Sequence, residues 1–131
     1  MNKTWMLIGA VFSALLSTQS VAGSAALDEL LQVYAAQATL SLDAQRGATF
    51  WQSAGPNETR CSSCHGVDTK TEGKHLKTGK LIEPMAPSVN PDRLQDVNTI
   101  EKWLFRNCKA VWSRECTAQE KGDVLLWLGQ Q

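Results

Sequence analysis

The five residues Cys61-Ser62-Ser63-Cys64-His65 form a CxxCH run, and this run decides what the chain can fold around. A CxxCH run is the attachment motif of a c-type haem. Each thiol adds across one vinyl group of the porphyrin, and the adjacent imidazole then lies where it takes the iron as proximal ligand. The sequence therefore predicts one covalent haem c, bound by Cys61 and Cys64, with His65 as the proximal axial ligand.

The same cysteines are compatible with two other kinds of site, a thioredoxin-like redox pair and half of a zinc site. A thioredoxin-like pair belongs to a βαβ pattern, and no such pattern is evident around Cys61. The two remaining cysteines, Cys108 and Cys116, lack the spacing of a zinc ribbon. Haem attachment is therefore the better interpretation.

The N-terminal stretch has the three parts of a secretory signal peptide. Lys3 gives a positive start, residues 5–16 are almost wholly apolar, and Ser20-Val21-Ala22 offers small residues for cleavage. The apolar run is short for a bilayer span, although an uncleaved anchor is the alternative. We expect residues 1–22 to be the signal peptide and residues 23–131 to be a periplasmic haem domain. Export agrees with the motif, because bacteria attach haem c outside the cytoplasm.

The charge balance bears on the partners of the chain. There are 13 basic and 13 acidic residues, so the formal net charge at pH 7 is zero. Domains that bind nucleic acid normally carry a basic excess. No nucleic-acid partner is therefore predicted.

Cys108 and Cys116 are the two cysteines that haem attachment leaves over. In an oxidising compartment the simplest outcome for such a pair is a disulfide. Two free buried thiols are the alternative.

Apolar residues recur at helical spacing in four places, so the sequence predicts an all-α domain. Asn98 with Glu101 resembles a capping box, and Thr117 with Glu120 repeats it before the last helix. Glycines, prolines and polar residues between positions 55 and 91 predict a long loop around the haem. The four stripes are Leu27, Leu30, Leu31 and Tyr34; Ala44, Gly47, Ala48 and Trp51; Ile100, Trp103, Leu104 and Asn107; Val124, Leu125 and Leu128.

The order of these elements is that of the small class I cytochromes c, and four segments resemble the SHP family of high-spin c-type haem proteins. The segments are residues 82–91 (IEPMAPSVNP), 101–108 (EKWLFRNC), 114–117 (RECT) and 120–123 (EKGD). They are specific jointly, although no single one is. The resemblance implies a small class I cytochrome c-like domain that wraps around one haem.

The resemblance also implies a ligand set. In the SHP family the sixth ligand of the iron is the asparagine just before the first cysteine of a disulfide. It leaves the iron on reduction and opens the site to small gases such as oxygen, nitric oxide and carbon monoxide. Carried over, the labile distal ligand is Asn107 and the disulfide joins Cys108 to Cys116. Electrons would arrive from a dihaem cytochrome c and a membrane cytochrome b.

Residue chemistry leaves other distal ligands open. Met85, between two prolines, would stabilise ferrous iron and make a closed electron carrier. His75 would give a bis-histidine site, although it sits among lysines. Asn107 continues the apolar stripe of its helix, so its amide should point inward and need a partner. Capping the end of that helix is the alternative role of Asn107.

Three functions are compatible with these residues. We expect a gas-binding haem protein with a labile Asn107 ligand that takes part in electron transfer, rather than an enzyme in the ordinary sense. A closed carrier with Met85 as sixth ligand and a periplasmic reductase of a small ligand are the alternatives. No catalytic residue is assigned, since no convincing acid lies near Asn107 in the sequence.

A group of four lysines either steers an acidic redox partner toward the haem or belongs to a solvated loop. The four are Lys70, Lys74, Lys77 and Lys80.

Overall fold

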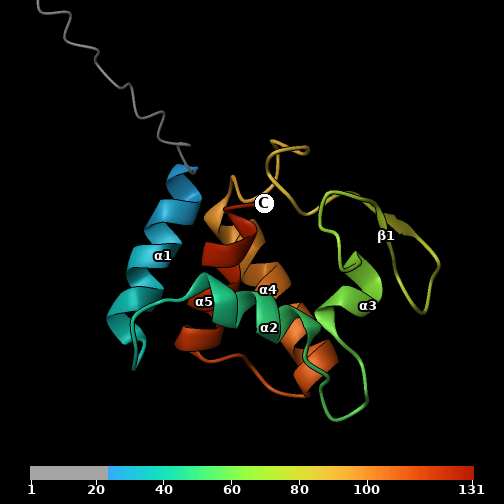
Figure 1. Cartoon of the computed structure of the whole chain (residues 1–131), viewed down its shortest axis with the longest axis horizontal. Coiled ribbons are helices and arrows are strands. Elements are labelled where there is room, and N and C mark those ends of the chain that lie inside the picture. Colours follow the sequence, from blue (N-terminus) through green and yellow to red (C-terminus); the bar gives the residue numbers. More distant parts are fainter. Residues whose placement is uncertain (1–23) are drawn as a thin grey trace, which may run out of the picture.

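The computed structural model describes residues 24–131, and the expected signal peptide, residues 1–22, lies outside them. The described chain forms five helices and one small hairpin (Figure 1). The helices are α1 (Ala25–Gln37), α2 (Ala44–Gln52), α3 (Cys61–His65), α4 (Val97–Trp112) and α5 (Ala118–Leu128). The hairpin strands are β1 (Gly73–Lys74) and β2 (Leu81–Ile82). The predicted helical class is confirmed, with α3 and the hairpin as additions.

None of the helices within residues 24–131 combines the length and the apolarity needed to cross a bilayer.

Each of the four long helices begins at a polar residue that satisfies a free backbone N–H of the first turn. In every case the side chain accepts a hydrogen bond from the N–H three residues later. The predicted capping box of Thr117 and Glu120 is present at the start of α5. The four N-cap residues are Ser24, Asp43, Asp96 and Thr117.

The ends of α4 differ from the prediction. Asp96, rather than Asn98, is the N-cap, and its carboxylate accepts a hydrogen bond from the Thr99 N–H at 2.8 Å. At the other end Ser113 takes a left-handed conformation with a φ of 57°, which is a common way to end a helix. Asn107 therefore lies inside α4, and the proposed capping role for this residue is wrong.

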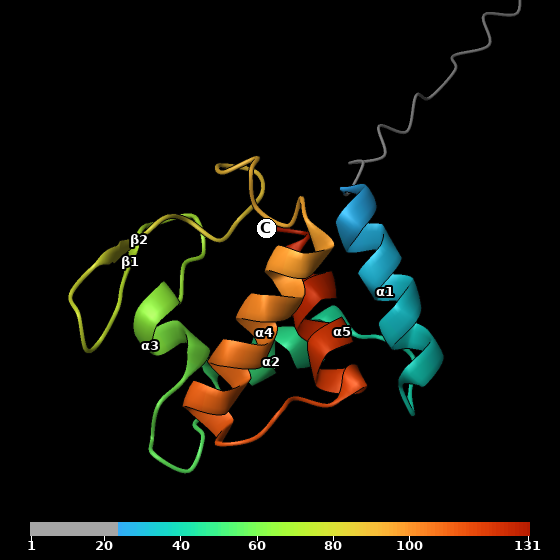
Figure 2. The same ribbon diagram turned by 180° about the vertical axis from the view of Figure 1, so that it is seen from behind.

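The hydrophobic core lies where α5 meets the other long helices. Helix α5 packs mainly against α2 and α1, and α1 also contacts α4 (Figure 2). Leu125 in α5 is only 1% exposed. The buried apolar cluster, called the core cluster below, consists of Leu27, Leu30, Tyr34, Trp51, Leu94, Ile100, Val124, Leu125 and Leu128.

Helices α2 and α5 approach closely because Gly47 has no side chain. A Cβ atom on Gly47 would lie 2.6 Å from the carbonyl carbon of Asp123 and 3.0 Å from Cβ of Trp127. The buried Asp123 carboxylate accepts hydrogen bonds from the Asp43 N–H at 2.7 Å and from Nε of Arg46 at 2.8 Å. Burial alone raises the pKa of Asp123, but these hydrogen bonds hold it below its ordinary value. The contact fixes α2 on the core.

The long loop predicted between residues 55 and 91 contains regular structure that the sequence pattern missed. Helix α3 spans the CxxCH run itself, and β1 pairs with β2 in antiparallel register, Gly73 opposite Ile82. Strands of two residues are too short to show an alternating pattern. In both views the hairpin projects to one side of the helical body (Figures 1 and 2).

Candidate haem-binding site

Helix α3 carries both free thiols and the imidazole of the motif in a little more than one turn. Cys61 and Cys64 are partly buried, and a separation of three residues puts them on one side of a helix. Burial, with a smaller effect of Cys64, raises the pKa of the Cys61 thiol to about 11. Cys61 is therefore a neutral S–H group at pH 7. Addition across a vinyl group gives the sulfur to one carbon and the hydrogen to the other.

The His65 imidazole at the end of α3 is held in its neutral form. Burial, followed by the positive charges of Arg93 and His75, lowers the pKa of His65 to about 4. A metal ion binds the lone pair of a neutral imidazole, so a proton does not compete at pH 7. Within residues 24–131, the buried Nδ1 atom of His65 has no hydrogen-bond partner. Two thiols beside a neutral imidazole fit a covalently bound haem c.

Trp51 of α2 packs against the His65 ring. The two ring centroids lie 5.4 Å apart, with the planes inclined by 39°. Nε1 of Trp51 donates a hydrogen bond to the Gly66 carbonyl at 3.0 Å. The Trp51 ring also packs against the ring of Trp127, with the two ring centroids 5.4 Å apart. A histidine ligand is usually oriented by a hydrogen bond from its second nitrogen. Nδ1 lacks that partner within residues 24–131, and the packing of Trp51 limits the positions that the His65 ring can take.

The segment after the motif folds back onto α3. A Cβ atom on Gly73 would lie 2.8 Å from Cα of His65 and would overlap the Cys64 carbonyl, so only glycine fits there. The Thr69 carbonyl accepts hydrogen bonds from the N–H groups of Met85 and Ala86 at 2.8 and 2.9 Å. The hairpin and the Met85 segment are therefore both anchored close to His65.

Met85 is positioned by packing and by backbone hydrogen bonds around it. Its partly buried side chain packs against the core cluster. Arg93 fixes the preceding turn, donating from Nε to the Pro84 carbonyl at 2.9 Å and from Nη2 to the Glu83 carbonyl at 2.8 Å. Packing and backbone hydrogen bonds thus account for the position of Met85.

His75 lies in the exposed turn of the hairpin. Its Nδ1 accepts a hydrogen bond from the Thr78 N–H at 3.2 Å, and its own N–H donates to the Lys80 carbonyl at 2.9 Å. The imidazole therefore takes part in shaping the turn.

Asn107 is half-buried on α4, and its amide makes no hydrogen bond within residues 24–131. The next residue, Cys108, is buried and forms a disulfide with Cys116, with the two Cα atoms 5.6 Å apart. Trp103, one turn earlier, is 47% exposed, so the predicted apolar stripe is only partly buried. Helix α3, which carries the CxxCH run, packs mainly against α2 and β1.

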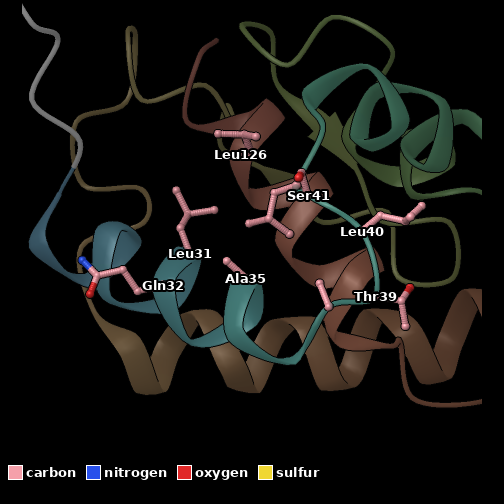
Figure 3. Close-up of a pocket in the computed structure, with 9 residues that line it drawn as sticks. Leu31, Gln32, Ala35, Thr39, Leu40, Ser41 and Leu126 are labelled. Atoms are coloured by element: carbon pink, nitrogen blue, oxygen red, sulfur yellow. The ribbon is translucent and has the colours of Figure 1, made fainter.

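A separate hollow of about 620 Å³ lies between α1, the link to α2, and α5. Leu31 and Ala35 face it from α1, Leu40 from the link and Leu126 from α5 (Figure 3). No residue of the CxxCH run lines it. This hollow is not part of the haem-binding site.

Comparisons with known proteins agree with this chemistry. A family model described as a domain of unknown function, DUF1924, matches residues 37–128. The cytochrome c-type protein SHP of Cereibacter sphaeroides is 42% identical over 125 residues, which cover 92% of this chain and 96% of that protein. A solved structure described as oxidized SHP, an oxygen binding cytochrome c, matches with a TM-score of 0.76 and 42% identity. It covers 83% of this chain and 100% of that one.

A more distant structure shares the same fold. The crystal structure of oxidized cytochrome c'' from Methylophilus methylotrophus has a TM-score of 0.68 and 26% identity, over 79% of this chain and 92% of that one. The CxxCH donor set, the helical fold and these relatives define a c-type cytochrome with covalent haem c. The chain belongs to the SHP family, as the segments at residues 82–91 and 101–108 predicted.

Proposed function

We propose that this chain is an exported cytochrome c with one haem, in which His65 is the permanent axial ligand and Asn107 is a ligand of the ferric state only. The observation that carries the proposal is the position of Asn107, whose uncommitted amide lies inside α4 beside the disulfide. Its SHP relative, 42% identical, is described as an oxygen binding cytochrome c. We extend that property to this chain.

The residues of the CxxCH run would hold the haem in both oxidation states. When bound, the haem supplies an iron that exchanges one electron and, in the ferrous state, takes up small gases. Cys61 and Cys64 would tether the porphyrin by two thioethers. His65 offers a neutral nitrogen, and Trp51 packs against the His65 ring.

Asn107, by contrast, would dissociate from the iron when the haem is reduced. The amide oxygen of Asn107 is a weak neutral donor, so its bond to the metal gains from the ferric charge. Reduction would remove one positive charge and weaken that attraction, which would release Asn107. An amide has two N–H donors, and the freed Asn107 can donate one of them to a small gas in its place.

The two alternative functions have less support. A closed carrier needs the Met85 thioether as the sixth ligand of the iron. The position of Met85 is already explained by packing against the core cluster and by the hydrogen bond from its N–H to the Thr69 carbonyl. A reductase needs a proton donor. On α4, the acid Glu101 is engaged with the hydroxyl of Tyr34 at 2.5 Å and with Nζ of Lys121 at 3.5 Å.

We propose that residues 1–22 direct export to the periplasm and are removed there. The electron donors proposed by resemblance are a dihaem cytochrome c and a membrane cytochrome b. Purification from a periplasmic extract with a mass that lacks the leader tests the export proposal.

The test of the function is the absorption spectrum of ferric and ferrous protein, with and without carbon monoxide. We expect the ferrous form to be high-spin and to bind carbon monoxide without a slow ligand-release phase, because Asn107 has already left. A histidine and methionine ligated cytochrome c serves as the control and should bind little carbon monoxide. A low-spin ferrous spectrum that carbon monoxide leaves unchanged would reject the proposal in favour of a closed carrier.

We also expect the disulfide to affect the haem, because Cys108 follows Asn107 directly. Replacing Cys108 and Cys116 by alanine should lower the free energy of unfolding by about 2.5 kcal/mol and should alter the ferric spectrum. Denaturant unfolding and absorption measure the two effects. Leu30→Ala, a buried change on α1 that costs about 2–5 kcal/mol, is the control and should leave the spectrum unaltered. A cysteine variant that is less stable but has a native ferric spectrum would show that the disulfide stabilises the fold without affecting the haem.

A further inference from the structure

Four lysines gather on and beside the β1–β2 hairpin, and Glu72 is the one acid that lies between them in the sequence. These four lysines, called the hairpin lysines, are exposed and form no ion pair within residues 24–131. The nearest acid in sequence before them, Asp68, uses its carboxylate to accept the Lys70 backbone N–H at 2.9 Å. The hairpin lysines are Lys70, Lys74, Lys77 and Lys80.

Several other cations of the described chain are engaged by neighbouring groups. Lys102 and Arg106 lie over the ring of Trp103, at 5.6 and 5.4 Å from its centroid. Lys109 lies over the ring of Phe105 at 5.5 Å. Such cation–π contacts hold a charge on the protein's own surface. Three further cations take part in ion pairs, namely Arg46, Arg114 and Lys121. The hairpin lysines are therefore more available to a partner.

Apolar side chains are exposed among these lysines. Leu76 at the turn is 61% exposed and Leu81 on β2 is 69% exposed, while Val67 at the base is 67% exposed. Exposed leucines within a group of lysines fit the combination of apolar contact and polar rim that protein interfaces use.

The hairpin holds one shape and one position. Its turn is closed by hydrogen bonds from the His75 N–H to the Lys80 carbonyl and from the Gly79 N–H to the His75 carbonyl, both at 2.9 Å. Gly79 has a φ of 68°, which glycine adopts without strain. Because Gly73 packs against Cys64 and His65, a protein on the hairpin lies beside the haem motif.

We propose that the surface formed by the hairpin lysines with Leu76 and Leu81 docks the carboxylate-rich face of a one-electron donor protein. This inference rests on the proposed electron-transfer function and names its partner by charge. Carboxylates would pair with the lysines, and apolar side chains would cover the two leucines. The docked donor would give up one electron and the ferric haem would take it up, so no proton or other reactant is needed.

The test uses flavodoxin hydroquinone, an acidic one-electron donor, mixed with the ferric holoprotein in a stopped-flow instrument. Lys74→Glu with Lys77→Glu should lower the second-order rate constant by about tenfold at low ionic strength and flatten its salt dependence. Lys102→Glu with Lys109→Glu changes the net charge equally and should lower the rate constant by no more than about twofold. Leu76→Ser with Leu81→Ser should slow reduction even at high salt, because apolar contact is not screened.

Equal rate constants for the two charge-reversal variants would overturn the proposal, since net charge alone would then explain the effect. Binding of anionic phosphatidylglycerol vesicles that requires Lys74 and Lys77, with unchanged flavodoxin kinetics, would instead make the hairpin a membrane contact. Dithionite should reduce all variants fully, with native spectra. Failure of the ferrous protein to bind carbon monoxide would reject the proposed gas-binding function while leaving the salt-dependent reduction interpretable.

Discussion

Protein in which Cys61 and Cys64 are both replaced by serine should carry no covalent haem at all. A hydroxyl does not form the thioether, so His65 alone would be left to hold a porphyrin, and denaturation would release it. The measurement is haem staining and intact mass after denaturing, reducing electrophoresis of the exported protein. This is the largest effect expected of any change in the chain.

Two further variants separate attachment from folding. Cys61→Ser alone should keep the haem through a single thioether at Cys64. The alanine variant of Cys108 and Cys116 should stain like wild type, because those thiols lie outside the motif. Wild-type protein recovered with zinc and no haem would contradict the assignment of the site, and so would a haem-stained double serine variant.

Asn107→Ala should convert the ferric protein to one with water or no ligand on the distal side. Its spectrum should shift toward high spin, and anionic ligands such as cyanide should bind the ferric form faster. The ferrous form should change less, because the wild-type ligand has already left. Oxygen should dissociate about fivefold faster from the variant, since a lost hydrogen bond costs on the order of 1 kcal/mol.

Met85→Ala is the matched control for Asn107→Ala. Met85 is a partly buried residue packed against the core cluster, so its loss should lower stability by less than the about 2–5 kcal/mol of a fully buried methionine and should preserve ferric ligation. A methionine-to-iron charge-transfer band that disappears only in Met85→Ala would identify a closed carrier and exclude Asn107 as the ligand.

Local patterns in the sequence predicted much of the helical body. The stripe from Leu27 to Tyr34 and the box of Thr117 and Glu120 depend on residues within two turns of one another, so a short window contains the whole signal. The start of α4 was misplaced because Asp96 and Asn98 are both good N-caps. Only the hydrogen bond in the folded chain distinguishes them.

The hairpin was missed for a different reason. Its strands are two residues long, and its position depends on Gly73 packing against the backbone of Cys64 and His65. Neither feature leaves a periodic pattern. A glycine in a polar loop predicts a turn equally well whether it is solvated or buried.

The sequence by itself determined the chemistry that neighbouring residues share: the two thiols and imidazole of the CxxCH run, the helical class and the SHP resemblance. Only the tertiary structure decided that Trp51 packs against the His65 ring and that Arg93 holds the turn before Met85. It also placed Asn107 within its helix rather than at the end. The physical reason is range. Spacing within one element is encoded locally, whereas contacts between elements depend on how several helices pack at once, and no single segment of sequence contains that information.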